Sequence, residues 1–225
     1  MDKVNETVST FNKMAQKYQD KYMDCGLYRD SLDKLCGLIF EEQTLNRTTI
    51  LEVGCGPGNV SQYLLNWRST DNEKLNIDIA GFDLAPSMIK LAKQNNPQCH
   101  YHVRDMRDLN DLCPQSSADT FNIAICAFCI PYLDQLELTQ FITDLANVLA
   151  ANSLLFISFM EDDYQNSVTQ ESAVGDRVHM HYFQSEDVIK LCQAQGFELV
   201  EKHTKDYLVD DVKQATDCFI YLRRE

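Results

Sequence analysis

The apolar residues of this chain follow two spacings that alternate along its middle part. Between residues 48 and 160, short apolar runs typical of buried strands alternate with segments in which apolar residues recur every three to four positions, as on one face of a helix. The predicted strands are 49–53, 77–82, 100–104, 121–127 and 153–160, and the predicted helices are 59–67, 86–95 and 136–149. Such alternation indicates parallel strands, so we expect an α/β fold whose sheet has helices on both faces.

The segments on either side of this alternation have different patterns. Helical spacing predicts two helices, 4–23 and 27–45, before the first strand. Residues 161–181 are polar and irregular, and a further helix is predicted over 185–195, with Ser185 as its N-cap and Gly196 at its end. Two strands, 197–207 and 218–223, are predicted to close the sheet. The polar link between them is too short for a crossover helix, so we expect them to be antiparallel.

Charge narrows the possible partners. The chain has 34 acidic and 20 basic residues and a net charge of −14. A protein that binds nucleic acid through its phosphates needs a basic face, and an anionic membrane surface attracts basic segments, so neither partner is expected. The sequence contains no apolar run of about 18 residues, the length that a membrane-spanning helix needs. The first residues lack the basic-then-apolar pattern of a signal peptide, and we expect a cytoplasmic protein.

The cysteines agree with that location. Several of the nine cysteines lie within apolar runs, which indicates buried free thiols in a reducing compartment. Cys126 and Cys129 have the spacing of redox and metal sites, but no second pair accompanies them. Their apolar neighbours favour packing in the core, and we expect no metal site.

A glycine-rich turn follows the first predicted strand. Residues 52–58 read Glu-Val-Gly-Cys-Gly-Pro-Gly and lead directly into a predicted helix. Glycine lets the chain turn sharply and lets a ligand approach the backbone closely, because no Cβ intervenes. Open parallel sheets bind ligands outside the carboxyl ends of their strands. The turn is therefore expected to border a binding site.

Two further strand ends carry acids that suit a nucleoside. Asp83 follows the second strand, where a carboxylate can accept hydrogen bonds from both hydroxyls of a ribose. Asp105 follows the third strand, where it and a backbone N–H can bind the edge of an adenine. Leu84 and Met106 can cover the faces of that ring. Three consecutive strand ends thus predict a site for an adenosyl ligand.

Both NAD and S-adenosylmethionine are adenosyl ligands, and three details favour the second. The glycine spacing is G-x-G-x-G, whereas NAD-binding folds use G-x-G-x-x-G. Glu52, two residues before Gly54, would tolerate a cationic ligand but not a pyrophosphate. No later segment is typical of a nicotinamide site. An NAD-dependent oxidoreductase is kept as the weaker alternative.

In these stretches the chain resembles the class I S-adenosylmethionine-dependent methyltransferases, in the group that acts on small molecules. The resemblance covers about residues 11–160 and rests on Phe11-x-x-x-Ala15-x-x-Tyr18 and on residues 50–58, 81–89, 104–106 and 121–132. It implies a Rossmann-like, mostly parallel sheet of seven strands whose last strand is antiparallel, with helices on both faces and an N-terminal helical lid.

The resemblance also implies roles for individual residues. Backbone around Gly54 and Gly56 would hold the methionine portion, Asp83 the ribose, and Asp105 with Met106 the adenine. The fourth strand end would border the methionine. The full set of predicted cofactor-binding residues is Tyr18, Glu52, Gly54, Cys55, Gly56, Asp83, Leu84, Met88, Asp105, Met106, Cys126 and Ala127.

The acceptor is less well defined than the methyl donor. The fourth strand end reads Cys-Ala-Phe-Cys-Ile-Pro-Tyr over residues 126–132. It lacks the Asn/Asp-Pro-Pro-Tyr pattern typical of amino-group methylation on nucleic acid bases, which counts against that activity. We expect in-line transfer of a methyl group to a small molecule, with S-adenosylhomocysteine as the product. A protein methyltransferase and a non-catalytic protein that keeps the cofactor pocket are the alternatives.

No catalytic residue is assigned, but three are candidates. Tyr18 and Tyr22 lie four residues apart on one helix face, where they either face the core or form a lid over the cofactor and substrate. His179 and His181 point the same way if their segment is extended, and no further ligands are spaced to complete a metal site. If the acceptor must lose a proton, His179, His181 and Tyr18 are the candidates.

These features predict one methyltransferase domain over residues 1–225. It would consist of an N-terminal helical lid (1–46), a cofactor-binding core (47–160), a substrate-side insertion (161–184) and a closing helix with a β-hairpin (185–225). The nucleophilic atom of the acceptor and the oligomeric state are left open.

Overall fold

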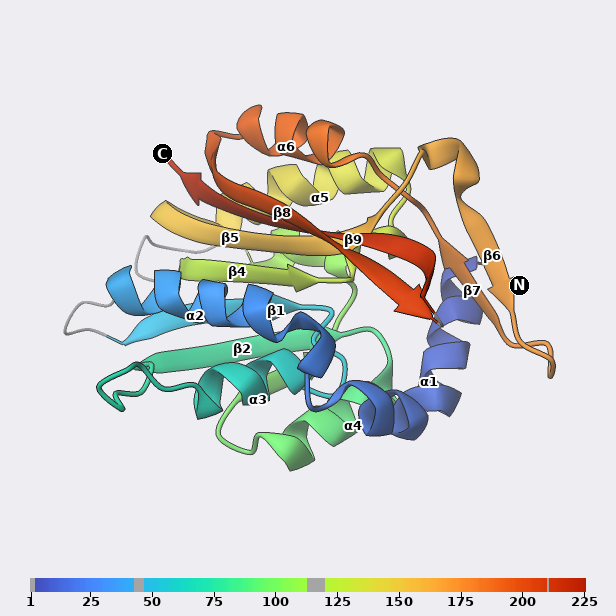
Figure 1. Cartoon of the computed structure of the whole chain (residues 1–225), viewed down its shortest axis with the longest axis horizontal. Helices are drawn as coiled ribbons and strands as arrows, with labels where there is room; N and C mark the ends of the chain where they lie inside the picture. Colours follow the sequence, from blue (N-terminus) through green and yellow to red (C-terminus); the bar gives the residue numbers. More distant parts are fainter. Residues whose placement is uncertain (1–2, 43–46, 113–119, 210) are drawn as a thin grey trace.

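The computed structural model describes residues 3–42, 47–112, 120–209 and 211–225, and a seven-stranded sheet lies at its centre. The strand order is β3-β2-β1-β4-β5-β9-β8 (Figure 1). The strands are β1 (Thr48–Val53), β2 (Ile77–Asp83), β3 (His100–Val103), β4 (Phe121–Ala127), β5 (Leu149–Glu161), β8 (Phe197–Val209) and β9 (Val212–Arg224). Strands β1 to β5 are parallel, and β9 is antiparallel to both β5 and β8. The predicted sheet, with its antiparallel last strand, is confirmed.

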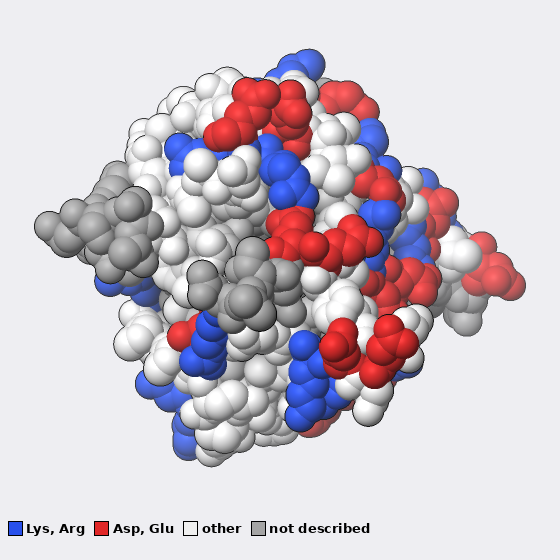
Figure 2. Space-filling model, turned by 90° about the vertical axis from the view of Figure 1, so that its left-hand side faces the viewer, with Lys and Arg blue, Asp and Glu red and all other residues white. Residues whose placement is uncertain are grey.

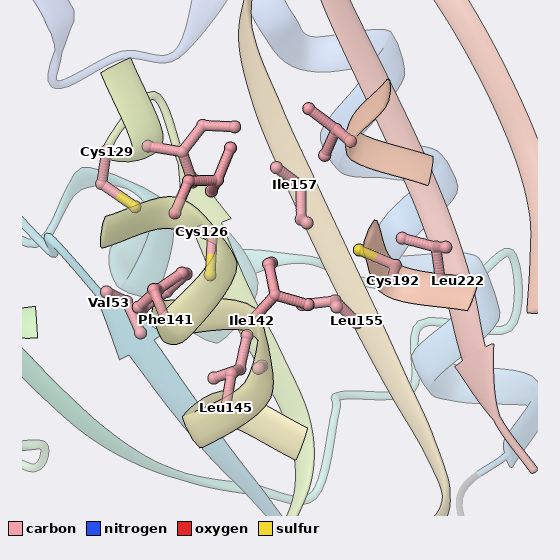
Figure 3. Packing of buried hydrophobic residues seen from close by; sticks show 14 of the residues in the cluster. Val53, Cys126, Cys129, Phe141, Ile142, Leu145, Leu155, Ile157, Cys192 and Leu222 are labelled. Carbon is pink, nitrogen blue, oxygen red and sulfur yellow. The ribbon is translucent and has the colours of Figure 1, made fainter. Parts of the chain in front are cut away.

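Helices cover both faces of the sheet, and each face has its own apolar cluster. On one face, α2 (Arg29–Glu42) and α3 (Asn59–Asn66) pack on the strands. On the other face, α5 (Gln135–Val148) and α6 (Ser185–Gln193) do so. Figure 3 shows this second cluster, in which Ile142 and Leu145 of α5 lie near Leu155 of β5. The apolar spacing that predicted α5 and α6 is thus the spacing of their buried faces.

Local sequence signals fix where two helices begin. Pro86 occupies the first turn of α4 (Pro86–Asn95), where its missing N–H costs no hydrogen bond. At α5, Asp134 accepts the N–H of Glu137 at 2.9 Å, and the Glu137 carboxylate accepts the N–H of Asp134 at 2.9 Å. This capping box fixes the start of α5, shortly after the 3-10 helix η4 (Ile130–Tyr132) that joins β4 to α5.

The N-terminal helix α1 (Lys3–Tyr22) lies across the carboxyl ends of the parallel strands, next to β6 and β7 (Figure 1). Thr10 Oγ1 donates to the carbonyl of Arg177 at 2.7 Å, and Lys13 pairs with Asp176 at 2.5 Å. Nε2 of His179 lies 2.9 Å from a Glu6 carboxylate oxygen. These side chains join α1 to β7 over the end of the sheet.

Residues 161–181 are more regular than the sequence predicts. They contain the 3-10 helix η5 (Tyr164–Asn166) and a two-stranded sheet of β6 (Val168–Glu171) and β7 (Arg177–Met180). All four residues of β6 are exposed, so neither face needs apolar side chains and the usual alternation is absent. The prediction of an irregular segment was therefore wrong.

The closing hairpin is also longer than predicted. Strands β8 and β9 contain 13 residues each, so most of the segment between 207 and 218 that we predicted as a polar link is strand. Backbone pairing continues to Val209 and Val212, beyond the part of the hairpin that packs on the core. The exposed part carries polar residues, which conceals it from a search for apolar runs.

Candidate active site

Two adjoining cavities lie at the carboxyl ends of the parallel strands, and α1 borders both. The first cavity has a volume of about 520 Å³ and the second about 410 Å³. The first extends over the ends of β2 and β3, and the second extends across β5 and β9. Six residues line both cavities and form their shared wall, namely Tyr18, Gly54, Gly56, Ala127, Phe128 and Tyr132.

The glycine turn between β1 and α3 is part of this shared wall and borders both cavities. Gly54 and Gly56 have φ angles of +63° and +53°, which favour glycine. A Cβ at Gly54 would lie 2.6 Å from the Cβ of Cys129, whereas a Cβ at Gly56 would lie 3.9 Å from a ring carbon of Tyr18. Packing therefore requires glycine at position 54. The backbone of both glycines is open to a ligand.

Asp83, at the end of β2, lines the first cavity and is oriented by the turn itself. Its Oδ2 accepts the N–H of Gly56 at 3.0 Å, and its Oδ1 accepts the N–H of Ala85 at 2.8 Å. Burial raises the pKa of the Asp83 carboxyl, and these two hydrogen bonds oppose the rise. Each oxygen keeps a further lone pair, so the carboxylate can still accept from two ligand hydroxyls.

The end of β3 contributes a carboxylate that is already held in place. Asp105 lines the first cavity together with Leu84, Met88 and Met106. Arg107 holds Asp105 with two bonds, Nη2 to Oδ2 at 2.7 Å and Nε to Oδ1 at 2.8 Å. Sequence reasoning missed Arg107, although a guanidinium two residues after the acid was a visible signal. The pair fixes the edge of the cavity with apolar side chains beside it.

Glu52 is fully buried on β1 and lines the second cavity, not the first. Ser61 of α3 donates a hydrogen bond from its hydroxyl to the Glu52 carboxylate. Burial raises the pKa of Glu52 to about 7, and the bonds from Ser61 oppose that rise. A carboxyl group with this pKa would be stabilised in its charged form by a cationic ligand group.

Three aromatic side chains, Tyr18, Phe128 and Tyr132, complete the shared wall. Tyr18 of α1 contacts Tyr22, with ring centroids 4.6 Å apart, and burial raises the pKa of Tyr18, so its hydroxyl stays neutral. Tyr132 of η4 packs edge-on against Phe11 at 5.3 Å. Phe128 has a φ of +55°, a strained conformation for this residue, and its N–H donates to the carbonyl of Ser158 at 2.8 Å.

Sequence reasoning missed Phe128 and Tyr132 as wall residues. Both lie within the stretch 121–132 that carried the family resemblance, but their aromatic side chains gave no separate signal of a binding site. Of the tyrosines predicted for the lid, Tyr18 lines both cavities and Tyr22 lines the second.

Two predicted cofactor-binding residues point away from both cavities. Cys126 is buried in the core near Phe141 (Figure 3), because successive strand residues point to opposite faces and Ala127 takes the cavity side. Cys55 is buried among Ile89, Ala92 and Tyr101, and its N–H is used by the carbonyl of Phe82. Their side chains are therefore part of the packing beneath the site.

The two candidate histidines line the first cavity and differ in their contacts. His179 Nδ1 lies 2.7 Å from the Thr169 hydroxyl, and its other ring nitrogen faces Glu6. His181 stacks on Tyr164 with ring centroids 5.4 Å apart, and its buried Nδ1 has no partner among the described residues. Burial lowers the pKa of His181, so its ring is neutral near pH 7 and can accept a proton.

The face at the amino ends of the parallel strands lies opposite both cavities. Figure 2 shows Lys and Arg interspersed with Asp and Glu on this face, so its described residues form no continuous basic surface. Within the part of the chain that the structure describes, no helix is both long and apolar enough to cross a membrane.

Comparison with known proteins agrees with this geometry. A family model described as a methyltransferase domain matches residues 13–202. A malonyl-[acyl-carrier protein] O-methyltransferase of Salmonella typhimurium is 23% identical over 80% of this chain and 64% of its own length. A protein of the same name from a Paenibacillus species is 28% identical over 66% of this chain and 52% of its own. The chain thus spans only about half to two thirds of these relatives.

Solved structures share the fold over nearly the whole chain. The magnesium protoporphyrin IX methyltransferase of Synechocystis with bound S-adenosylhomocysteine has a TM-score of 0.71 at 14% identity, with 100% of both chains covered. A Burkholderia thailandensis 1,6-didemethyltoxoflavin-N1-methyltransferase has a TM-score of 0.67 at 14% identity, covering 98% of this chain and 88% of that one. With a family model that matches most of its length, the chain belongs to the methyltransferase-domain family.

Proposed function

We propose that this chain binds S-adenosylmethionine along the three strand ends and transfers its methyl group to a small molecule. One observation carries the proposal: the carboxylate of Asp83 is fixed by the N–H of Gly56 at 3.0 Å, in a cavity that continues from Asp105 to the glycine turn. The proposed adenine edge at Asp105, the ribose acid at Asp83 and the open glycine turn then follow one another across β3, β2 and β1, in the order of the three parts of the cofactor.

The residues present fit this cofactor in charge as well as in order. Asp83 keeps free lone pairs for ribose hydroxyls, and Met106 and Leu84 offer apolar surface for an adenine ring. Glu52 is a buried acid behind the glycine turn, with Ser61 as its hydrogen-bond donor. It suits the cationic amino group of a methionine, and the unfavourable burial of its charge would be relieved by that group.

The cofactor would supply a methyl group already activated by a sulfonium, so the protein needs chiefly to align the acceptor and to exclude water. Tyr18, Phe128 and Tyr132 are suited to both tasks, because they surround the junction of the two cavities. Helix α1 carries Tyr18 and is held over the junction by its bonds to β7. Opening α1 is therefore our expected route for entry.

Three observations support a small acceptor. The cavities, at about 520 and 410 Å³, have the size of ordinary small-molecule sites. The chain's net charge of −14 disfavours nucleic acid. The Burkholderia neighbour was crystallised with 1,6-didemethyltoxoflavin, a small molecule. A malonyl group on an acyl carrier protein, as in the names of the bacterial relatives, is the second candidate, because their sequences match most of this chain.

Calorimetry and a transfer assay test the proposal together. We expect S-adenosylhomocysteine to bind with micromolar or better affinity and NADH not to bind. The methyl-transfer assay would use radiolabelled S-adenosylmethionine and a panel of small amines, alcohols and carboxylates, with malonyl acyl carrier protein as a separate arm. Absence of S-adenosylhomocysteine binding would refute the cofactor assignment. Tight binding with no transfer to any acceptor would favour a non-catalytic protein that keeps the pocket.

A further inference from the structure

The second cavity contains an aromatic chamber beyond the glycine turn. Its rings come from separate parts of the chain, and three of them lie close to one another. Tyr28 lies 4.8 Å from Phe128 and 5.9 Å from Phe219, and the two phenylalanine rings are 6.1 Å apart, measured between ring centroids. The other aromatic residues that line this cavity are Tyr18, Tyr22, Tyr132, Phe156 and Tyr207.

The carboxylate of Asp217, on β9, lines the cavity beside these rings. It is only 4% exposed and makes no ion pair with any cation in the described parts of the chain. Lys205, its neighbour across the β8–β9 ladder, instead donates to the carbonyl of Leu27 at 2.8 Å. Burial raises the pKa of Asp217 to about 6, and hydrogen bonding by Tyr28 and the positive charge of Lys205 oppose the rise. At neutral pH the chamber therefore holds a buried negative charge that makes no direct ion pair with the described residues.

A second polar group in the same wall also lacks a partner. The Ser158 hydroxyl is buried and makes no hydrogen bond with the residues that the structure describes. Ser158 lies on β5, paired with Phe219 on one side and Ala127 on the other, so it belongs to the same surface as the rings. Buried polar groups are nearly always hydrogen-bonded, so this hydroxyl is available to a polar group that enters the cavity.

The charges around the second cavity also favour a cation. Its charged lining residues are Asp24, Glu52, Asp217 and Lys21, three acids and one base. Lys21 Nζ lies over the Tyr22 ring, 4.8 Å from the centroid. Aromatic faces attract cations, and a desolvated carboxylate strengthens that attraction. A neutral or anionic ligand would leave the buried Asp217 carboxylate without a direct ion pair.

We infer that this chamber binds the methyl acceptor, and that the acceptor is a small molecule with a cationic ammonium group, held by Asp217 and the surrounding rings. The inference rests on the proposed function, because the shared wall at Gly54 and Phe128 places the chamber directly beside the turn expected to hold the methionine portion. Glu52 would then serve the amino group of the cofactor, and Asp217 the ammonium group of the acceptor.

Calorimetry with benzyltrimethylammonium and with neutral benzyl alcohol tests the inference, with and without S-adenosylhomocysteine. The cation cannot itself be methylated at nitrogen, so binding is measured without turnover. We expect the cation to bind at least about tenfold more tightly than the alcohol. Asp217→Asn should weaken cation binding about tenfold and leave the affinity for S-adenosylhomocysteine unchanged. Asp206→Asn, on the exposed part of the same hairpin, is the matched control and should change neither.

The Asn variant replaces a buried charge with a neutral group of the same shape, so we expect it to fold. Phe219→Leu provides a second test and should weaken cation binding more than alcohol binding, because it removes a ring face. Equal binding of the two probes, or full cation affinity in Asp217→Asn, would overturn the inference. If S-adenosylhomocysteine fails to bind while the cation binds through Asp217, the proposed function fails and the cation site stands.

Discussion

Glu52 offers a direct test of how the site is built, because its burial disfavours the charge that we assign to cofactor binding. The residue is 2% exposed, and burial raises the pKa of its carboxyl from 4.5 to about 7. Replacing it by glutamine keeps the shape and the bond from Ser61 but removes the titration. The variant Glu52→Gln therefore isolates the free energy of the buried charge.

The sign of the effect follows from proton linkage. Between pH 4.5 and about 7 the folded protein keeps a proton on Glu52 that the unfolded chain has lost, so the wild-type free energy of unfolding falls as the pH rises. At 1.36 kcal/mol for each pKa unit, the loss between about pH 5 and pH 8.5 is about 2–3 kcal/mol. The glutamine variant does not suffer this loss.

Urea unfolding of both proteins at these two pH values measures the difference. We expect the stability of Glu52→Gln relative to wild type to be about 2–3 kcal/mol more favourable at pH 8.5 than at pH 5. The exposed Glu73→Gln should shift by less than about 0.5 kcal/mol. A relative stability that is the same at both pH values would refute the burial argument. Affinity for S-adenosylhomocysteine should fall in Glu52→Gln, because the amino group loses its counter-charge.

Three other changes test separate parts of the site. Asp83→Ala should weaken S-adenosylhomocysteine binding at least about tenfold by calorimetry, and unchanged affinity would refute its ribose role. Gly54→Ala should destabilise the fold by more than about 2 kcal/mol in urea, because its Cβ would meet another side chain at 2.6 Å. Gly175→Ala, with a similar φ of +81° and open space, should cost only about 1 kcal/mol. Glu6→Ala should speed amide hydrogen exchange in α1, because it removes the bond to His179. Unchanged exchange would show that this bond does not hold α1 in place.

The central fold could be predicted because each of its elements buries an apolar face. Residues 123–127 of β4 are all apolar and the strand lies in the middle of the sheet, and α5 carries both an apolar face and a complete capping box at Asp134. The exposed hairpins could not be predicted in the same way. Strands β6 and β7, and the outer half of β8 and β9, are held by backbone hydrogen bonds, and polar residues satisfy them equally well.

The grouping of the proposed donor-binding residues could be predicted for a related reason. Gly54, Asp83 and Asp105 each lie at a strand end or within two residues of it, so sequence order alone brings them to one edge of the sheet. The direction of each side chain was harder to predict, because Cys126 and Ala127 are consecutive residues and only Ala127 faces the cavities. Deciding between them requires the pleat of β4, which the apolar run 123–127 does not reveal.

The acceptor side depends on pairings that no local pattern encodes. Tyr28, Phe128 and Asp217 are far apart along the chain, and the antiparallel pairing of β9 with β5 brings Asp217 to the cavity that all three line. This pairing sets Asp217 opposite Met160 and Phe219 opposite Ser158, so a one-residue change of register would turn both β9 side chains to the other face. On the inferred assignment, recognition of the acceptor by this chain depends on the register of the closing hairpin. We therefore expect changes in that hairpin to alter acceptor binding and to leave the proposed donor site at the glycine turn and Asp83 intact.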